Sequence, residues 1–258
     1  MAKQDNGRAK WSMVVDSDRC TGCQACVVAC QAENNIPLNE EDIFKQRRAM
    51  SWIRIERYWE VPFEYTQHPK KPEDAPFDQV KARFLPILCQ HCENAPCEPV
   101  CPVFATYHND EGLNVQVYNR CIGTRFCANN DPYNVRFFNF WEPVWPETLR
   151  NQLNPDVTVR SRGVMEKCTF CVQRIRRTER TARKDKRELA DGEIAPACVQ
   201  ACPTDALVFG DISNPDNRVS KLAKDARSYR LLEEQGTEPN IHYLMKVDPF
   251  LTEENGHE

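Results

Sequence analysis

The cysteine group that decides the fold reads Cys20-Thr21-Gly22-Cys23-Gln24-Ala25-Cys26-Val27-Val28-Ala29-Cys30. Its cysteines are separated from one another by only two or three residues. Thiols so close in sequence make poor disulfide partners, because a disulfide requires a specific separation and orientation of the two Cβ atoms. They are, however, good ligands for a shared metal centre. The spacing therefore predicts a loop of metal ligands.

The same cysteine motif, C-x2-C-x2-C-x3-C-P, recurs along the sequence with variations. The ligand positions of the three later groups are Cys89, Cys92, Cys97 and Cys101; Cys121, Thr124, Cys127 and Asp131; and Cys168, Cys171, Cys198 and Cys202. A proline follows the last position in each of these three groups. Cysteine occupies all sixteen positions except two, so none of the 14 cysteines in the sequence is left over.

This pattern favours iron–sulfur clusters over zinc. A third cysteine one turn after a C-x2-C pair, with a fourth in the same phrase, is typical of proteins that hold paired [4Fe–4S] clusters. A zinc ribbon needs only two C-x2-C pairs, and the split fourth group fits that loosely. Zinc in the fourth group is therefore the alternative, and a structural zinc protein is the alternative function from another class.

The groups can pair in two ways. In a two-cluster ferredoxin, three close thiolates hold one cube and the fourth ligates the neighbouring cluster. Neighbouring groups could pair in sequence order, or the two inner groups could form one ferredoxin inserted into the other, and the spacing leaves both open. Nested pairing gives four ligand sets: Cys20, Cys23, Cys26 and Cys202; Cys30, Cys168, Cys171 and Cys198; Cys89, Cys92, Cys97 and Asp131; and Cys101, Cys121 and Cys127 with Thr124.

The two positions without cysteine predict different chemistry. A threonine hydroxyl is a poor iron ligand beside three soft thiolates. We therefore expect a [3Fe–4S] cluster at Cys101, Cys121 and Cys127, with Thr124 at the vacant corner and a raised potential. A carboxylate can bind iron as a monodentate ligand, so we expect Asp131 to complete a [4Fe–4S] site. The alternative is that Asp131 is a turn residue before proline.

Composition excludes several other classes of protein. The 258 residues carry 34 basic and 38 acidic side chains, so a net charge of −4 gives no support for a nucleic-acid partner. A bilayer-spanning helix needs roughly 20 apolar residues, and no such run occurs. We found no acid–base or nucleophilic motif and no G-x-G-x-x-G loop. We therefore expect a non-catalytic electron-transfer subunit with no catalytic residues.

Short strands are predicted beside the cysteine groups, at residues 13–15, 83–88, 114–118 and 206–209. An alternating pattern at 52–58 predicts a further strand within an inserted segment, residues 34–82, which ends in a proline-rich connection. The basic stretch 172–190 is interpreted as the solvated face of a helix, with a docking surface for an acidic partner as the alternative. Residues 229–234 are amphipathic, and Gly236 is a plausible helix stop.

Two further features could bear on the tuning of a cluster or the binding of a quinone. His91 lies between two predicted ligands, and we interpret it as a partly exposed loop histidine rather than as a donor to cluster sulfur. An aromatic stretch follows the third group. We interpret it as core or interface packing rather than as a quinone contact. Its members are Phe137, Phe138, Phe140, Trp141 and Trp145.

The sequence resembles the four-cluster electron-transfer subunits of molybdopterin-type oxidoreductase complexes. The segment 121–140, CIGTRFCANNDPYNVRFFNF, is similar to one branch of that family, which contains the iron–sulfur subunits of alternative complex III and of the quinone reductase complex of sulfate reducers. Residues 231–239 resemble the family's C-terminal docking segment. The resemblance covers residues 11–245 and implies nested pairing, although relatives usually have cysteine where Asp131 stands.

The resemblance implies an α+β fold of two nested bacterial-ferredoxin-like modules with short strands and helices. The expected units are residues 1–88, the first half of the outer module with the inserted segment; 89–140, the inner module; 141–210, the second half of the outer module; and 211–258, a C-terminal docking tail. Three [4Fe–4S] clusters and one [3Fe–4S] cluster would relay electrons between the partners of a membrane-bound menaquinol oxidoreductase complex.

The implied partners are an integral membrane quinone-binding subunit of polysulfide-reductase type, near the Thr124 cluster, a large molybdopterin-type subunit and a multihaem cytochrome c. The chain would be a peripheral membrane protein on the periplasmic face, with the cytoplasmic face as the alternative. The first residues, 1–5, show neither a Sec nor a twin-arginine signal, so we expect export with a partner. The alternative function is the electron wire of a molybdenum or tungsten enzyme, such as a formate dehydrogenase or dimethyl sulfoxide-type reductase.

Overall fold

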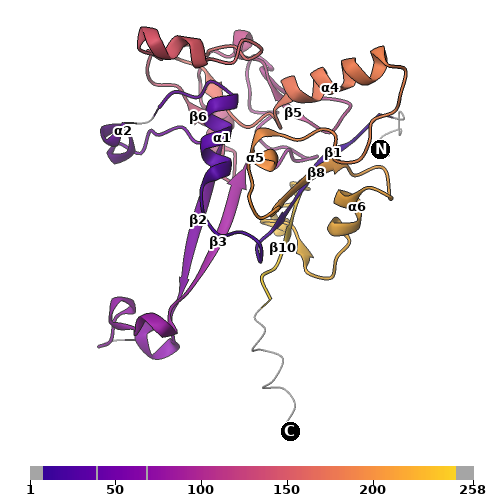
Figure 1. Ribbon diagram of the computed structural model, residues 1–258. Coiled ribbons are helices and arrows are strands. Elements are labelled where there is room, and N and C mark those ends of the chain that lie inside the picture. Colours follow the sequence, from indigo (N-terminus) through magenta and orange to yellow (C-terminus); the bar gives the residue numbers. More distant parts are fainter. Residues whose placement is uncertain (1–7, 39, 68, 248–258) are drawn as a thin grey trace.

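A four-stranded sheet brings together the first and last strands of the described chain. The computed structural model describes residues 8–38, 40–67 and 69–247. The strand order is β8-β1-β10-β9, with β1 antiparallel to β8 and parallel to β10 (Figure 1). The strands are β1 Trp11–Asp16, β8 Leu207–Asp211, β9 Ser228–Tyr229 and β10 Ile241–Leu244. The sheet therefore fixes the first and last parts of the described chain next to each other.

Both faces of this sheet are buried. The run Trp11–Val15 is buried at every position, because helix α6 (Arg218–Ala223) covers one face and the cysteine-containing core covers the other. Val14, Val208 and Val219 form a small apolar cluster on the α6 side. Met13 and Val15 belong to the larger core, which includes most of the buried cysteines.

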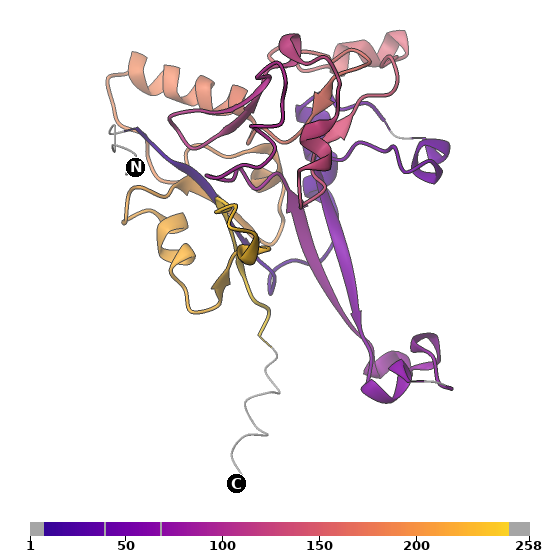
Figure 2. The ribbon, with the colours of Figure 1, turned by 180° about the vertical axis from the view of Figure 1, so that it is seen from behind.

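A long hairpin projects from the body of the molecule (Figures 1 and 2). Its strands are β2 (Ile53–Glu60) and β3 (Lys81–Leu88), paired from Ile53 with Leu88 to Glu60 with Lys81. Its base is buried at Ile53 and Leu88, whereas Trp59 near the tip is 58% exposed. Three short 3-10 turns form the tip: η1 Phe63–Thr66, η2 Pro72–Asp74 and η3 Phe77–Gln79.

The remaining elements are short and surround the cysteine groups. The helices are α1 Ala25–Glu33, α2 Glu41–Lys45, α3 Phe126–Asn129, α4 Val172–Lys184 and α5 Ala197–Gln200. The strands are β4 Thr106–His108, β5 Asn114–Gln116, β6 Phe137–Phe138 and β7 Met165–Glu166, and the 3-10 turns are η4 Tyr118–Arg120, η5 Glu147–Gln152 and η6 Glu233–Gln235. The fold is thus mixed α/β with short strands and helices, as expected.

Most predicted elements form, and the differences have local causes. The strand predicted over 114–118 ends at Gln116, because the backbone turns into η4 before Cys121. The amphipathic piece 229–234 is not an α-helix: it contributes to β9 and then forms the 3-10 turn η6, which ends at Gly236 with φ +65°. Residues 218–244 of the predicted tail form α6, β9 and β10 within the body.

Most of the basic stretch forms α4, which ends at Lys184, before the end of the predicted stretch 172–190. Its buried positions are Ile175 and Ala182, and the rest of the helix is more accessible. Several arginines are ion-paired, with Arg174 binding Glu33 at 2.8 Å and Arg176 binding Glu111. The helix is therefore held to the body by charge pairs as well as by its apolar stripe. Nowhere in the described ranges is there a helix both long and apolar enough to traverse a bilayer.

Candidate iron–sulfur sites

The predicted ligands gather in four places. We name each by its first cysteine. Three hollows are lined, respectively, by Cys20, Cys23, Cys26 and Cys202 (the Cys20 site); by Cys89, Cys92, Cys97 and Asp131 (the Cys89 site); and by Cys101, Cys121, Thr124 and Cys127 (the Cys101 site). The Cys30 site consists of the remaining four thiols, Cys30, Cys168, Cys171 and Cys198. Burial raises the pKa of Cys30, and the other three thiols lie close enough to add to that rise.

The Cys30 site is enclosed by α1, α4 and α5. Cys30 lies on α1, Cys171 caps the N-terminus of α4, and Cys198 lies on α5. The buried Asn34 amide donates towards the sulfurs of Cys30 and Cys171, at 3.6 and 3.7 Å. One side chain therefore joins thiols from two distant parts of the sequence.

All four groups share one backbone feature. The residue before the second ligand position has a positive φ in each: Gly22 at 71°, His91 at 45°, Gly123 at 70° and Phe170 at 52°. This left-handed conformation turns the loop around the space that the ligands face. The third group keeps the turn although its second ligand position is Thr124. Threonine at this position therefore changes the donor atom but is compatible with the same turn.

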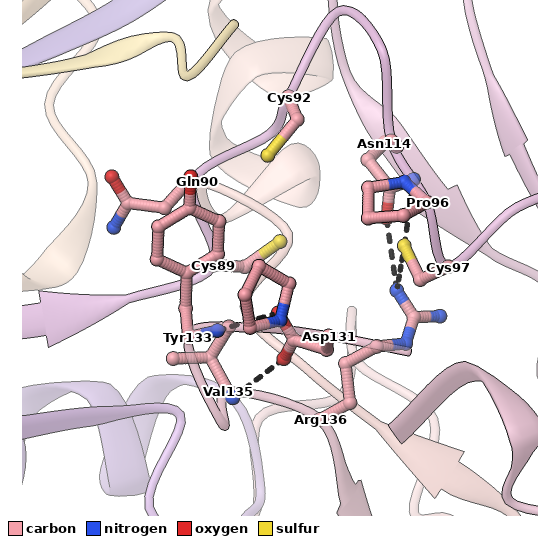
Figure 3. Close-up of a pocket in the computed structure, with 12 residues that line it drawn as sticks. Cys89, Gln90, Cys92, Pro96, Cys97, Asn114, Asp131, Tyr133, Val135 and Arg136 are labelled. Carbon is pink, nitrogen blue, oxygen red and sulfur yellow. Dashed lines mark hydrogen bonds between the residues drawn. The ribbon is translucent and has the colours of Figure 1, made fainter. Parts of the chain in front are cut away.

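Three of the groups also share the turn after the last ligand position. The sulfurs of Cys101 and Cys202 accept the backbone N–H groups of Ala105 and Ala206, four residues on, at 3.2 and 3.3 Å. Asp131 accepts the equivalent N–H of Val135 through Oδ2 at 2.7 Å (Figure 3). The carboxylate of Asp131 thus takes the place that a cysteine sulfur occupies in the related turns.

Burial makes these thiols unfavourable as free thiolates. Desolvation, reinforced by neighbouring thiols, raises the pKa of Cys26 and of Cys92 to about 12. Desolvation raises the pKa of Cys97 to about 12 as well. At Cys101, by contrast, backbone N–H groups outweigh the opposing desolvation and lower the pKa. Buried sets of soft sulfur donors suit iron, which binds thiolates and supplies positive charge. The residues present therefore fit iron–sulfur clusters.

Several buried polar groups beside the sulfurs were missed by sequence reasoning. The Arg136 guanidinium donates to Cys97 Sγ at 3.3 Å and to Asn114 Oδ1 at 3.0 Å (Figure 3). Lys167 is fully buried and donates to the Cys168 carbonyl oxygen at 2.8 Å. Asn34 is buried too. Single polar residues carry no periodicity, and only the adjacency of Lys167 to Cys168 offered a signal.

His91 is completely buried, so the prediction of a partly exposed loop histidine is wrong. Its Nδ1 accepts the Asn114 N–H at 3.1 Å, and its ring stacks on Phe170 with centroids 4.0 Å apart. The Nδ1 atom therefore points at the backbone and not at a sulfur. The ring fills space between the segments that carry the Cys89 and Cys30 sites.

The aromatic stretch packs beside the Cys101 site. Phe138 and Phe140 meet edge to face at 4.7 Å. The guanidinium of Arg125, next to Thr124, lies over the Phe138 ring at 5.2 Å. Phe138 is half-buried. The packing interpretation is in line with these contacts, and the quinone-contact alternative stays a prediction.

Comparison with known protein families supports the cluster chemistry. Residues 80–145 match a 4Fe-4S dicluster domain, and residues 11–32 match a 4Fe-4S binding domain. The first range contains the ligands of the second group and of the third. The chain therefore contains ferredoxin-type iron–sulfur domains.

Relatives that match most of the chain define its family more narrowly. It is 43% identical to the menaquinone reductase iron–sulfur cluster-binding subunit of Nitratidesulfovibrio vulgaris, over 93% of this chain and 90% of that protein. It is 37% identical to a putative dimethyl sulfoxide reductase iron–sulfur subunit of Halobacterium salinarum (91% and 78% covered) and 34% identical to one component of the polysulfide reductase of Wolinella succinogenes (90% and 92% covered). The chain thus belongs to the family of iron–sulfur electron-transfer subunits of molybdopterin-type oxidoreductase complexes.

Proposed function

We propose that the chain relays electrons in a membrane-bound menaquinol oxidoreductase complex, through three [4Fe–4S] clusters and one [3Fe–4S] cluster. The observation that carries this proposal is the convergence of all 14 cysteines in four sets, and the composition of these sets supports nested pairing. Iron–sulfur clusters supply one-electron carriers when bound. The protein holds them close together, excludes water from the deeper ones and donates hydrogen bonds to their thiolates.

The proposed nested modules are the units expected from the sequence. The dicluster match at 80–145 encloses the inner module, 89–140. The outer module, 1–88 with 141–210, contributes Cys20 and Cys202, which line one hollow although they are far apart in the sequence. The pairing of β1 with β8 supports this, because it brings these two segments together. Residues 211–258 are the proposed docking tail.

The Cys101 site would hold the three-iron cluster. Its fourth position is the exposed Thr124, whose hydroxyl is a poor iron ligand beside thiolates. The Cys89 site keeps an anionic donor in Asp131, which favours a four-iron cluster there. The Cys20 and Cys30 sites have four cysteines each.

The Cys101 end would face the integral membrane subunit, which binds the quinone. Three large apolar side chains around this site, two on loops and one at the start of α3, are exposed: Phe104 by 72%, Ile122 by 64% and Phe126 by 55%. Exposed apolar groups gathered at one site are typical of an interaction surface. The opposite end would meet the large molybdopterin-type subunit and a multihaem cytochrome c, on the periplasmic side of the membrane.

Spectroscopy of the purified complex tests the cluster assignment. The oxidised complex should show a three-iron signal, and Thr124→Cys should convert it to a four-iron one because a fourth thiolate retains the fourth iron. Iron analysis should return about fifteen atoms per chain for three [4Fe–4S] clusters and one [3Fe–4S] cluster. If the three-iron signal persists in Thr124→Cys, the three-iron cluster lies at another of the four sites. Zinc without acid-labile sulfide would overturn the proposal.

Copurification tests the partner assignment. Ile122→Glu should weaken retention of a multi-span membrane subunit, whereas Phe77→Glu, at an exposed position on the hairpin tip, should not. The relative from Halobacterium salinarum, a putative dimethyl sulfoxide reductase subunit, favours the alternative function in a molybdenum or tungsten enzyme. The same purified complex tests this alternative. Molybdenum or tungsten in the large subunit, with substrate-dependent reduction of the clusters, would favour that alternative.

A further inference from the structure

Among the residues that the structure describes, three cations are buried near the cluster sites, and only one of them has an ion-paired carboxylate. Arg160 forms an ion pair with Glu166 at 2.8 Å, with both side chains fully buried. Arg136 and Lys167 are 6% and 0% exposed, and within the described ranges neither has a carboxylate at ion-pair distance. A buried charge without a counter-charge is strongly unfavourable. Neither of these two charges is therefore balanced by an ion-paired carboxylate in the described part of the chain.

Arg136 lies between the Cys89 site and the Cys101 site. Its Nη1 donates to the sulfur of Cys97, a ligand of the first site. Its Nη2 donates to Thr106 Oγ1 and Gln116 Oε1, both at 2.6 Å. Thr106 and Gln116 also line the hollow of the Cys101 site. The guanidinium therefore stands at the junction of two cluster sites, and an arginine is charged at every working pH.

Lys167 adjoins the Cys30 site, and its charge also acts on Cys97 of the Cys89 site. Its ammonium donates to the Cys168 carbonyl, and Cys168 is a ligand of the Cys30 site. Burial raises the pKa of both Cys168 and Cys97, and the charge of Lys167 opposes that rise in each. The Asp131 carboxylate, whose oxygens accept the N–H groups of Tyr133 and Val135, is one nearby negative charge for these two cations. Lys167 is thus the second charge at a junction between cluster sites.

We propose that the buried charges of Arg136 and Lys167 raise the reduction potentials of the clusters on either side of each residue. This inference rests on the proposed cluster assignment. Thiolate-ligated clusters are anionic and gain a further negative charge on reduction, so a fixed cation in a low-dielectric interior stabilises the reduced form. The Cys89 cluster feels both cations, the Cys101 cluster mainly Arg136, the Cys30 cluster mainly Lys167, and the Cys20 cluster neither.

Redox titration of the whole complex, followed by electron paramagnetic resonance, tests this pattern. Arg136→Met should lower the potential of the three-iron signal and of one four-iron signal by at least about 59 mV, a tenfold fall in the one-electron equilibrium constant. Lys167→Met should leave the three-iron potential unchanged and lower two four-iron potentials. Arg136→Lys and Lys167→Arg should restore the respective potentials, because each keeps the charge.

Controls separate charge from structure. Arg177→Met removes an exposed arginine paired with Asp156 and should shift no potential. Arg136→Gln is a second neutral variant that keeps amide donors, in case Arg136→Met fails to assemble. Full iron content with unchanged potentials in both neutral variants would overturn this inference alone. Iron and sulfide missing from the unmodified complex would overturn the proposed function instead.

Discussion

Glycine at position 123 is required by both conformation and space. Its φ is +70°, and a Cβ atom there would lie 2.2 Å from the Gly163 carbonyl oxygen and 2.8 Å from the Phe138 ring. The neighbouring backbone cannot move away without displacing β6 and β7. The loop from Cys121 to Cys127 therefore depends on the absence of a side chain at this position.

We expect Gly123→Ala to lower the free energy of unfolding by about 1–3 kcal/mol, the usual cost of a strained backbone. The distorted loop should also lose iron from the Cys101 site, so the three-iron signal should weaken. Thermal unfolding and iron analysis measure the two effects. Gly192→Ala is the matched control, because Gly192 has φ +77° but nothing within 4 Å of its Cβ position. Equal losses in both variants would contradict the close-contact explanation.

Asp131 allows a second test at residue scale. If its carboxylate holds the fourth iron of the Cys89 site, Asp131→Ala should convert that cluster to a three-iron form, and the oxidised complex should show a second three-iron signal. Asp131→Cys should restore a four-iron cluster with a lower potential, because a thiolate donates more charge to iron. An unchanged spectrum in Asp131→Ala would make Asp131 a turn residue only.

At the scale of elements, the hairpin has two parts with different roles. Ile55 and Pro86, in β2 and β3, line the hollow of the Cys20 site. The Phe84 ring lies where a Cβ on Gly22 would fall, at 2.5 Å. Among the described residues of the tip, between Glu60 and Lys81, none contributes to any of the four sites. The base therefore covers a cluster site, and the described part of the tip does not.

We expect replacement of residues 61–80 by Asn-Gly, which favours a tight hairpin turn, to leave iron content and all cluster signals unchanged. Phe84→Ala should instead lower the occupancy or stability of the Cys20 cluster, since it removes packing from the ligand loop. Iron analysis and redox titration compare the two proteins. Loss of a four-iron signal after shortening of the tip would contradict this division.

The elements that sequence predicts well are those beside the cysteines. Apolar runs of several residues mark β1, β3 and β8, and each forms where expected. Strand β10 was missed, because Ile241–Leu244 is a four-residue run within a polar segment. Its partner, β1, is more than 200 residues away, and such pairing leaves no local pattern. Cysteine spacing likewise predicts the ligands but not Asn34, Arg136 or Lys167, whose roles depend on the folded arrangement.

At the scale of the whole molecule, the clusters are expected to act as part of the core. The cysteines are mostly buried, and among the residues that the structure describes, the cations of Arg136 and Lys167 lie close to them without carboxylate partners. Without iron and sulfide, the two cations would lose the anionic clusters beside them. Metal binding of this kind contributes directly to folding. Stability and cofactor loading are therefore linked.

Chelation of iron should lower the thermal unfolding midpoint of the protein strongly, by more than the loss of one contact would explain. Circular dichroism melts of the loaded and stripped forms, kept under reducing conditions to prevent disulfide formation, measure the difference. In the stripped form, Arg136→Met should be less destabilising than in the loaded form, or even stabilising, because the unpaired charge is removed. Identical midpoints for loaded and stripped forms would contradict this linkage.

The left-handed residue that precedes the second ligand position in all four groups has an evolutionary consequence. Since the peptide conformation there is the same with cysteine or threonine following, the donor atom can be exchanged by point mutation without rebuilding the loop. A lineage could thus adjust the energy level of one carrier at a time while the architecture stayed constant. Such independent adjustment would let one scaffold serve partners that work at very different voltages.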